Sequence, residues 1–239
     1  MIFVPERKND PELLDMPAKS LDHAELAGSL ADISLVNRYL GDLCAVRKYM
    51  TRMTAGMDKS DATLTVLDVA TGSADIPIAI VDWARARGIS AKVTAVDINP
   101  CAITIAREKT AGYPEISLAV ADAHDLPYRD GSFDFVLCTK TLHHFSTSDA
   151  GEIVGRLSRL SRRGYIFIDI RRSWVAFSLI YILTRLFTRN RLTKNDGPLS
   201  VLRSFTVDEI AGLAKRGGLE GFRVERHPFW RVVLVGGKG

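Results

Sequence analysis

The most informative part of this chain is Val66-Leu-Asp68-Val-Ala-Thr-Gly72-Ser-Ala-Asp75. It begins as an apolar run typical of a buried strand, and a single glycine marks the turn that follows. Asp68 stands inside the end of this strand, where a carboxylate needs a partner because burial without one is costly. Open parallel sheets bind ligands outside the carboxyl ends of their strands. We therefore expect Asp68 to help hold a ligand at this edge.

The number of glycines in the turn narrows the class of ligand. Dinucleotide-binding turns carry the pattern G-x-G-x-x-G, so that backbone amides can approach a pyrophosphate. Here Gly72 is followed by Ala74 and Pro77 at the other two glycine positions, and Asp75 would repel a phosphate. The turn favours a ligand that lacks phosphate and carries a positive charge. It counts against a nicotinamide-dependent oxidoreductase, which is the rival enzyme class for this kind of sheet.

The composition fits one α/β domain with a full core, since 46% of the 239 residues are hydrophobic. The net charge is only +4, and no cluster of basic and aromatic residues predicts a nucleic-acid partner. Cys44, Cys101 and Cys138 lack C-x-x-C spacing, so we expect no disulfide framework, no metal site and a reducing cytoplasm. The N-terminus lacks the charged start and apolar run of a signal peptide.

Strand and helix patterns alternate from Thr63 onward. This alternation predicts a Rossmann-like, doubly wound α/β sheet that is mostly parallel, with helices on both faces. Thr206-Val-Asp-Glu209 predicts a capping box at the start of the last helix. Two short strands around Pro228 predict a C-terminal antiparallel hairpin. Strands are expected over 64–70, 92–97, 116–121, 133–139, 165–170, 222–227 and 230–235.

Two helical segments are expected outside this sheet. Residues 1–55 form an N-terminal lid segment, in which 1–20 are extended or poorly ordered and helices begin at Asp22 and Leu43. A polar linker over 56–62 leads into the main domain, residues 56–239. An apolar helical insert with basic ends occupies about 171–200, and Asn195-Asp-Gly-Pro198 is expected to be a turn. This insert suits a cap over an apolar pocket, a homodimer face or, through 172–191, a peripheral membrane contact.

Four stretches together resemble the class I S-adenosylmethionine-dependent methyltransferases of the type 11 group. The first, 66–75, is similar to the first motif of quinone-biosynthesis methyltransferases, and Asp97-Ile98 is the second. Val120-Ala-Asp-Ala-His-Asp-Leu-Pro127 and Cys138-Thr-Lys-Thr-Leu-His-His-Phe145 are the third and fourth. The resemblance implies S-adenosyl-L-methionine as cofactor and S-adenosyl-L-homocysteine as product.

The resemblance also implies individual site residues. Asp97 accepts the ribose hydroxyls, Ile98 packs on the adenine, and Asp122 with the Ala123 amide contacts the adenine edge. Asp75 either contacts the cofactor or only places charge at a helix start, and Arg38 either pairs with the cofactor carboxylate or is solvated. The implied cofactor-binding set is Asp68, Ala70, Thr71, Gly72, Asp75, Asp97, Ile98, Asp122, Ala123, Thr139 and Arg38.

The fourth stretch carries the candidate catalytic residues. Histidine titrates near neutrality, so His144, slightly ahead of His143, is our candidate base; the alternative is that the pair only shapes the cofactor pocket. Lys140 either orients an anionic acceptor or projects into solvent. The predicted reaction is O-methylation of a small, lipophilic hydroxylated aromatic. C-methylation of a quinone precursor and a non-catalytic cofactor-binding module are the alternatives.

Overall fold

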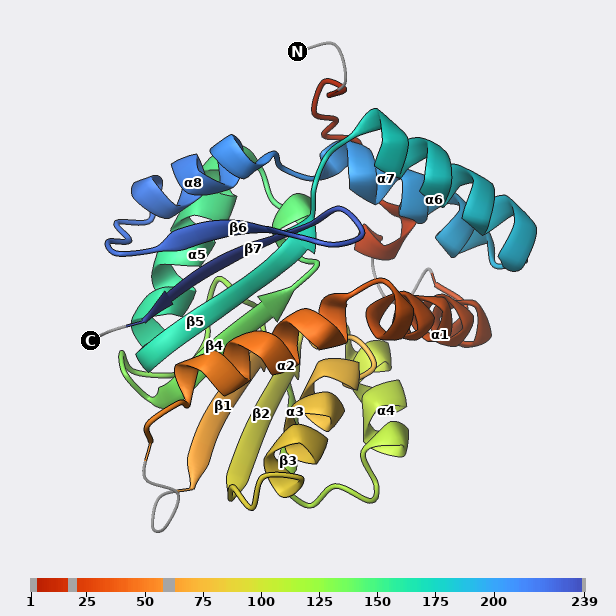
Figure 1. The fold of residues 1–239 in the computed structure, drawn as a ribbon. Helices are drawn as coiled ribbons and strands as arrows, with labels where there is room; N and C mark the ends of the chain where they lie inside the picture. The colour runs from red at the N-terminus through yellow and green to blue at the C-terminus, as the bar shows by residue number, and fades with distance from the viewer. Residues whose placement is uncertain (1–3, 17–20, 58–62, 238–239) are drawn as a thin grey trace.

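The computed structural model describes residues 4–16, 21–57 and 63–237 of the chain. These residues form one seven-stranded sheet with the strand order β3-β2-β1-β4-β5-β7-β6 (Figure 1). The first five strands are parallel, and β7 lies antiparallel between β5 and β6. The predicted Rossmann-like sheet with a C-terminal hairpin is confirmed. The strands are β1 (Leu64–Val69), β2 (Ala91–Asp97), β3 (Ile116–Val120), β4 (Phe133–Thr139), β5 (Ser161–Ile170), β6 (Arg223–His227) and β7 (Arg231–Gly237).

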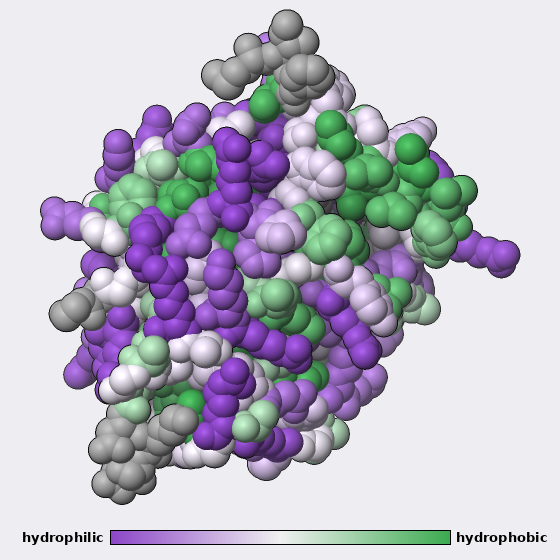
Figure 2. Space-filling model, in the orientation of Figure 1, coloured by the Kyte–Doolittle hydropathy of each residue, from purple (hydrophilic) through white to green (hydrophobic). Residues whose placement is uncertain are grey.

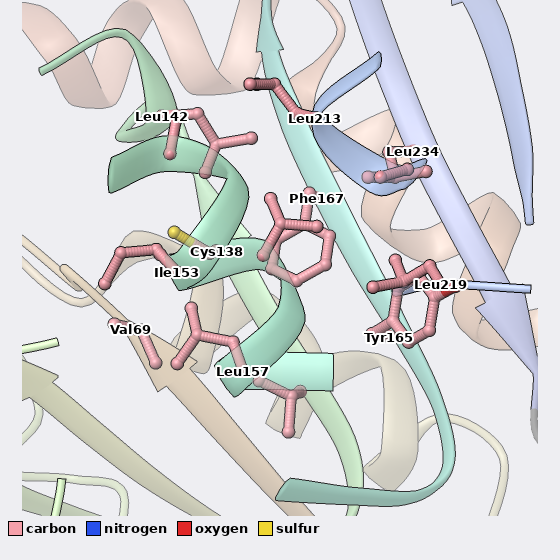
Figure 3. Close-up of a cluster of buried hydrophobic side chains, with 14 of the residues drawn as sticks. Val69, Cys138, Leu142, Ile153, Leu157, Tyr165, Phe167, Leu213, Leu219 and Leu234 are labelled. Atoms are coloured by element: carbon pink, nitrogen blue, oxygen red, sulfur yellow. The ribbon is translucent and has the colours of Figure 1, made fainter. Parts of the chain in front are cut away.

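Helices cover both faces of the sheet. On one face α5 (Thr147–Leu160) and α8 (Val207–Arg216) pack on β4, β5 and β7 through a large apolar cluster that includes Ile153, Phe167 and Leu213 (Figure 3). On the other face α2 (Asp42–Met53) and α3 (Asp75–Arg85) pack through a second cluster that includes Tyr49 and Ile80. With both faces covered, water reaches the central strands only at their ends.

The start of several helices follows the capping chemistry expected from the sequence. Asp22 accepts a hydrogen bond from Glu25 N at the start of α1 (His23–Tyr39), and Asn99 caps α4 (Pro100–Lys109). Thr206 and Glu209 form the predicted capping box of α8. These bonds satisfy amides that have no partner within the helix. Because α4 starts directly after β2, its cap also fixes the end of that strand.

The N-terminal segment packs more closely on the domain than its prolines suggest. Residues 4–16 run along the insert, and the short helix η1 (Leu13–Asp15) donates two backbone amides to Asp196. Glu12 is 2% exposed. Of the two expected states of this lead-in, poor order is therefore wrong for residues 4–16, whereas outside η1 these residues form no helix or strand, as an extended segment would. Positions 17–20, and 58–62 of the expected linker, lie outside the described residues.

The insert consists of two helices, α6 (Trp174–Phe187) and α7 (Arg191–Arg203), which pack against each other at one end of the sheet (Figure 1). The turn expected at 195–198 is wrong, because α7 continues through Pro198. A proline inside a helix frees the carbonyl four residues earlier. That carbonyl belongs to Lys194, and the Arg185 guanidinium donates to it at 2.9 Å. A neighbouring helix thus provides the bond that proline removes.

A buried ion pair joins the N-terminal segment to the C-terminal hairpin. Arg231 of β7 donates to both carboxylate oxygens of Asp42 in α2, at 2.7 and 2.9 Å. Arg231 is 3% exposed and Asp42 is fully buried. Removal of one partner would leave the other charge buried and unpaired.

We predict that Asp42→Ala lowers the free energy of unfolding by about 3–5 kcal/mol, the usual cost of breaking a buried pair. Glu115→Ala, which breaks the surface pair with Arg85, is the control and should cost much less. Urea denaturation followed by circular dichroism measures both variants. Equal losses in the two variants would contradict a structural role for the buried pair.

Candidate functional site

A cavity of about 1360 Å³ opens at the carboxyl ends of β1, β2 and β4. The first helix, α1, and the insert helix α6 close it from two sides. Small-molecule sites usually measure about 300–1,000 Å³, so this cavity has room for a cofactor and a second molecule together.

The β1–α3 loop forms the floor of the cavity. Asp97, at the end of β2, accepts hydrogen bonds from Gly72 N at 2.8 Å and from Asn99 N at 2.9 Å. Gly72 lies in the left-handed region at φ +56°, and so do Ala70 and Ala74. Left-handed non-glycine residues cost roughly 1–3 kcal/mol each and cluster at functional sites. The loop is therefore held in a strained shape, and Asp97 is one of the groups that hold it.

Several buried polar atoms around this floor lack a partner. Among the residues that the structure describes, Asp68 Oδ2, Thr71 Oγ1, Thr139 Oγ1 and Asn37 Oδ1 are buried without a hydrogen bond, and all four residues line the cavity. Burial raises the pKa of Asp68 to about 7. Buried polar groups normally have hydrogen-bond partners, so these atoms indicate that a polar ligand provides the missing partners.

Asp75 ties α1 to the same loop. It is the first residue of α3, and its carboxylate accepts from the Ser34 hydroxyl at 2.6 Å and from Asn37 Nδ2 at 3.2 Å. Lys109 lies 3.5 Å from it. Asp75 lines the cavity, but its oxygens already receive protein donors. Its contacts place the N-terminal helix against the loop.

The other predicted cofactor residues gather at the same edge, with one exception. Ile98 lines the cavity with 65% of its surface exposed, so it is not a core residue. Asp122 accepts from His124 N and keeps a half-exposed side chain. Arg38 is exposed, stacks on Tyr39 and does not line the cavity. The predicted residues that line it are Asp68, Ala70, Thr71, Gly72, Asp75, Asp97, Ile98, Asp122, Ala123, Thr139, His143 and His144.

The two histidines lie in η3 (Leu142–His144), and a carboxylate holds each of them. His143 Nδ1 lies 2.7 Å from Asp169 Oδ1 at the end of β5, and His144 Nδ1 lies 2.6 Å from Asp15 Oδ1. Burial opposes a charge on His144, but Asp15 and Glu12 outweigh it and raise its pKa. A raised pKa keeps the proton on His144, which makes this histidine a poorer base near neutrality.

Sequence reasoning missed the N-terminal acids of this cluster. Glu12 lies 3.6 Å from His143 Nε2 and 3.9 Å from His144 Nε2. These distances would suit ligands of one metal ion, but Arg203 lies 3.9 Å from Glu12 and already supplies a positive charge. The only sequence signal was an acid pair at 12 and 15, which pointed to no partner far along the chain.

Lys140 lines the cavity and is half-buried. No hydrogen bond or ion pair from the described residues reaches its ammonium group. Burial lowers its pKa to about 8. The residue adopts the left-handed φ of +54°, and its amide donates to Ile168 O at 2.7 Å. The strand ends thus present one unpaired amine beside the acidic floor.

Comparison with known proteins gives the family. A family model described as a methyltransferase domain matches residues 66–164. The demethylmenaquinone methyltransferase of Bacillus licheniformis is 36% identical over 177 residues, 69% of this chain and 73% of that protein. This chain belongs to the class I S-adenosylmethionine-dependent methyltransferases.

Two further similarities agree with this family. The ubiquinone/menaquinone biosynthesis C-methyltransferase UbiE of Chromobacterium violaceum is 27% identical over 175 residues, 68% of each chain. A solved S-adenosylmethionine-dependent methyltransferase from Aquifex aeolicus has a TM-score of 0.61 and 17% identity, covering 90% of this chain and 98% of that one. The second similarity supports the fold alone.

The cavity of this methyltransferase fits its cofactor. S-adenosylmethionine carries a cationic sulfonium, an amino group and ribose hydroxyls but no phosphate. The orphaned oxygens of Asp68, Thr71 and Thr139 can accept from its donors, and the acidic floor suits its charge. The residues that line the cavity therefore match S-adenosylmethionine in both charge and hydrogen-bonding capacity.

We predict that cofactor affinity depends on the protonation of Asp68. A cationic ligand favours the carboxylate, so binding below the pKa of about 7 must release a proton. Affinity should then fall by up to about tenfold for each pH unit below that pKa. Titration calorimetry in buffers of different ionisation enthalpy measures the released protons.

The matched variant Asp68→Asn separates this effect from titration of the cofactor itself. It should bind more weakly and lose the proton release assigned to Asp68. Unchanged proton release in this variant would contradict the assignment.

Proposed function

We propose that this methyltransferase methylates a ring carbon of a lipophilic, quinol-type acceptor. The observation that carries the proposal is the similarity to two enzymes named for quinone C-methylation or demethylmenaquinone methylation. This reaction replaces O-methylation, which the sequence motifs alone had favoured.

The lining of the outer cavity supports a lipophilic acceptor. The inner side of α6 contributes Ala176, Leu179, Ile180, Leu183 and Phe187, and the hairpin contributes Phe229 and Trp230. Burial of apolar ligand surface stabilises binding by about 25 cal/mol per Å². A ring with an apolar substituent gains from such walls, whereas a small polar acceptor does not.

We propose that Lys140 binds the hydroxyl group of the acceptor and takes its proton. The methyl donor supplies an electrophilic methyl group, and a phenol directs its ring electrons to that group best when it is ionised. With a pKa of about 8, the Lys140 amine can take the phenol proton and remain beside the phenolate as an ammonium. The ring carbon then forms the bond to methyl as the carbon–sulfur bond breaks, and the ring proton leaves to solvent.

The histidine pair is the second candidate for the proton acceptor. His143 is buried and oriented by Asp169, which is the arrangement of a general base and its orienting acid. The other ring nitrogen, Nε2, lies close to Glu12 in both histidines, so it is not available to an acceptor in the open part of the cavity. This contact makes Lys140 our first choice and leaves the histidines as positioning residues or as a relay.

The proposal also gives roles to Asp97, Ile98 and the N-terminal segment. Asp97 offers free lone pairs to the ribose hydroxyls, and Ile98 offers an exposed apolar face to the adenine. Within the expected lid segment 1–55, α1 acts as the lid, because it lines the cavity and is tied to the loop through Asp75, whereas α2 packs on the sheet. Residues 56–239 then form the catalytic domain with its insert.

We predict that the enzyme adds one methyl group to a substituted hydroquinone in the presence of S-adenosylmethionine. Mass spectrometry detects the product, and carbon NMR distinguishes a ring methyl from a methyl ether. Turnover should improve as the apolar substituent of the acceptor lengthens. A methyl ether would contradict C-methylation, and the absence of turnover across hydroquinones and phenols would contradict the proposed acceptor class.

We predict that Lys140→Met lowers kcat/KM at neutral pH by roughly 10²–10⁴, the usual contribution of a general base. The rising limb of the pH profile should move from about 8 toward the pKa of the acceptor phenol, about 10. Lys92→Met, an exposed lysine of β2, is the control and should behave as wild type. If the pH profile of Lys140→Met is unchanged and kcat/KM falls in His143→Gln, the general base is His143 and not Lys140.

A further inference from the structure

Helix α6 exposes a large apolar surface, part of it toward the cavity and part of it away from it. Eight large side chains of this 14-residue helix are between 37% and 79% exposed. Only Ala176 and Thr184 of the helix are buried. Figure 2 shows the apolar surface as a green patch at the upper right, over α6. The exposed side chains are Trp174, Val175, Leu179, Tyr181, Ile182, Leu183, Leu186 and Phe187.

Two sides of the helix have different surroundings. Leu179, Leu183 and Phe187 line the cavity, while Ile182 and Leu186 are exposed and do not line it. Residues four apart lie on the same side of a helix, so 179, 183 and 187 form one row and 182 and 186 another. Ile182 and Leu186 of the outer row are 52% and 70% exposed, and continuous exposed apolar patches mark interaction sites.

The segment that carries the helix holds only positive charges of its own. Residues 171–195 contain six arginines or lysines and no aspartate or glutamate. Arg172 and Arg191 pair with Glu209 and Glu25, whereas Arg185, Arg189 and Lys194 have no carboxylate partner among the described residues. The apolar surface is therefore bordered by cations that an anionic partner could neutralise.

The length of the helix limits what it can do in a lipid. Fourteen residues span about 21 Å, which is shorter than the roughly 30 Å of a bilayer core. No helix among the described residues is long and apolar enough to cross a membrane. An apolar helix of this length with basic neighbours suits the interface between headgroups and acyl chains.

We propose that α6 docks this protein on the surface of an anionic lipid bilayer, with Ile182 and Leu186 in the acyl boundary and Arg185, Arg189 and Lys194 at the headgroups. A second copy of the chain would bring the same basic residues against this surface, whereas anionic lipid brings the opposite charge. Because the inner side of α6 lines the cavity, docking places the cavity wall beside the lipid. This surface is argued from exposure and charge, so it does not rest on the proposed acceptor.

Cosedimentation with vesicles tests the proposal without any acceptor. Full-length protein should bind mixed phosphatidylcholine–phosphatidylserine vesicles, bind phosphatidylcholine alone much more weakly, and be released by salt. In the double variant Ile182→Glu/Leu186→Glu, the partition coefficient for the mixed vesicles should fall by more than about tenfold. Arg129→Glu, an exposed site on the β3–β4 loop, changes the net charge equally and should bind nearly as wild type.

Calorimetric affinity for S-adenosylmethionine shows whether the double variant is folded, since neither position lines the cavity. Failure of the wild-type protein to bind anionic vesicles would overturn the proposal. So would a wild-type dimer in sedimentation velocity that the double variant abolishes, because α6 would then join two copies. Failure of hydroquinone methylation would leave the vesicle result unchanged, so the two proposals fail separately.

Discussion

The site depends on the hydrogen bonds that Asp97 accepts from Gly72 and Asn99. Through the first, the end of β2 holds the loop that follows β1; through the second, it fixes the start of α4. Thr71 N, which donates to Val96 O, extends the same contact by one residue. A strained loop with left-handed residues persists only where its surroundings determine it. Without these bonds the cavity would lose its floor.

Charge gives this floor its selectivity. Asp68, Asp75 and Asp97 lie close enough to influence one another, and burial raises the pKa of Asp68 and Asp97. Lys109 lies 3.5 Å from Asp75 and outside the cavity lining. A phosphate would meet like charge here, whereas a sulfonium or ammonium gains from it. The lack of further glycines in the loop and the presence of these acids therefore both favour a cationic ligand over a phosphate-bearing one.

The parts of this fold that depend on local pattern could be predicted from the sequence. Alternating apolar runs predict the strands and a mostly parallel sheet, and Asn99 and Thr206 mark the starts of their helices because capping acts over a few residues. The acids at strand ends could be placed as well, since parallel strands bring their carboxyl ends to one edge. Pro198 misled the prediction, because the Arg185 bond that permits it comes from another helix.

Contacts between distant residues could not be predicted. Glu12 and Asp15 meet the histidines and Arg203 across more than 120 positions of sequence. A single sequence carries no signal for such pairs, and neither does it show that Lys140 would face the cavity unpaired. The candidate catalytic groups depend on such contacts, which explains why the cofactor was easier to infer than the reaction.

The most direct test of this account is a calorimetric comparison of S-adenosylmethionine with NAD on the same purified protein. The acidic, phosphate-free floor predicts saturable binding of S-adenosylmethionine and no detectable binding of NAD. Binding of NAD with no response to S-adenosylmethionine would contradict the account at its centre.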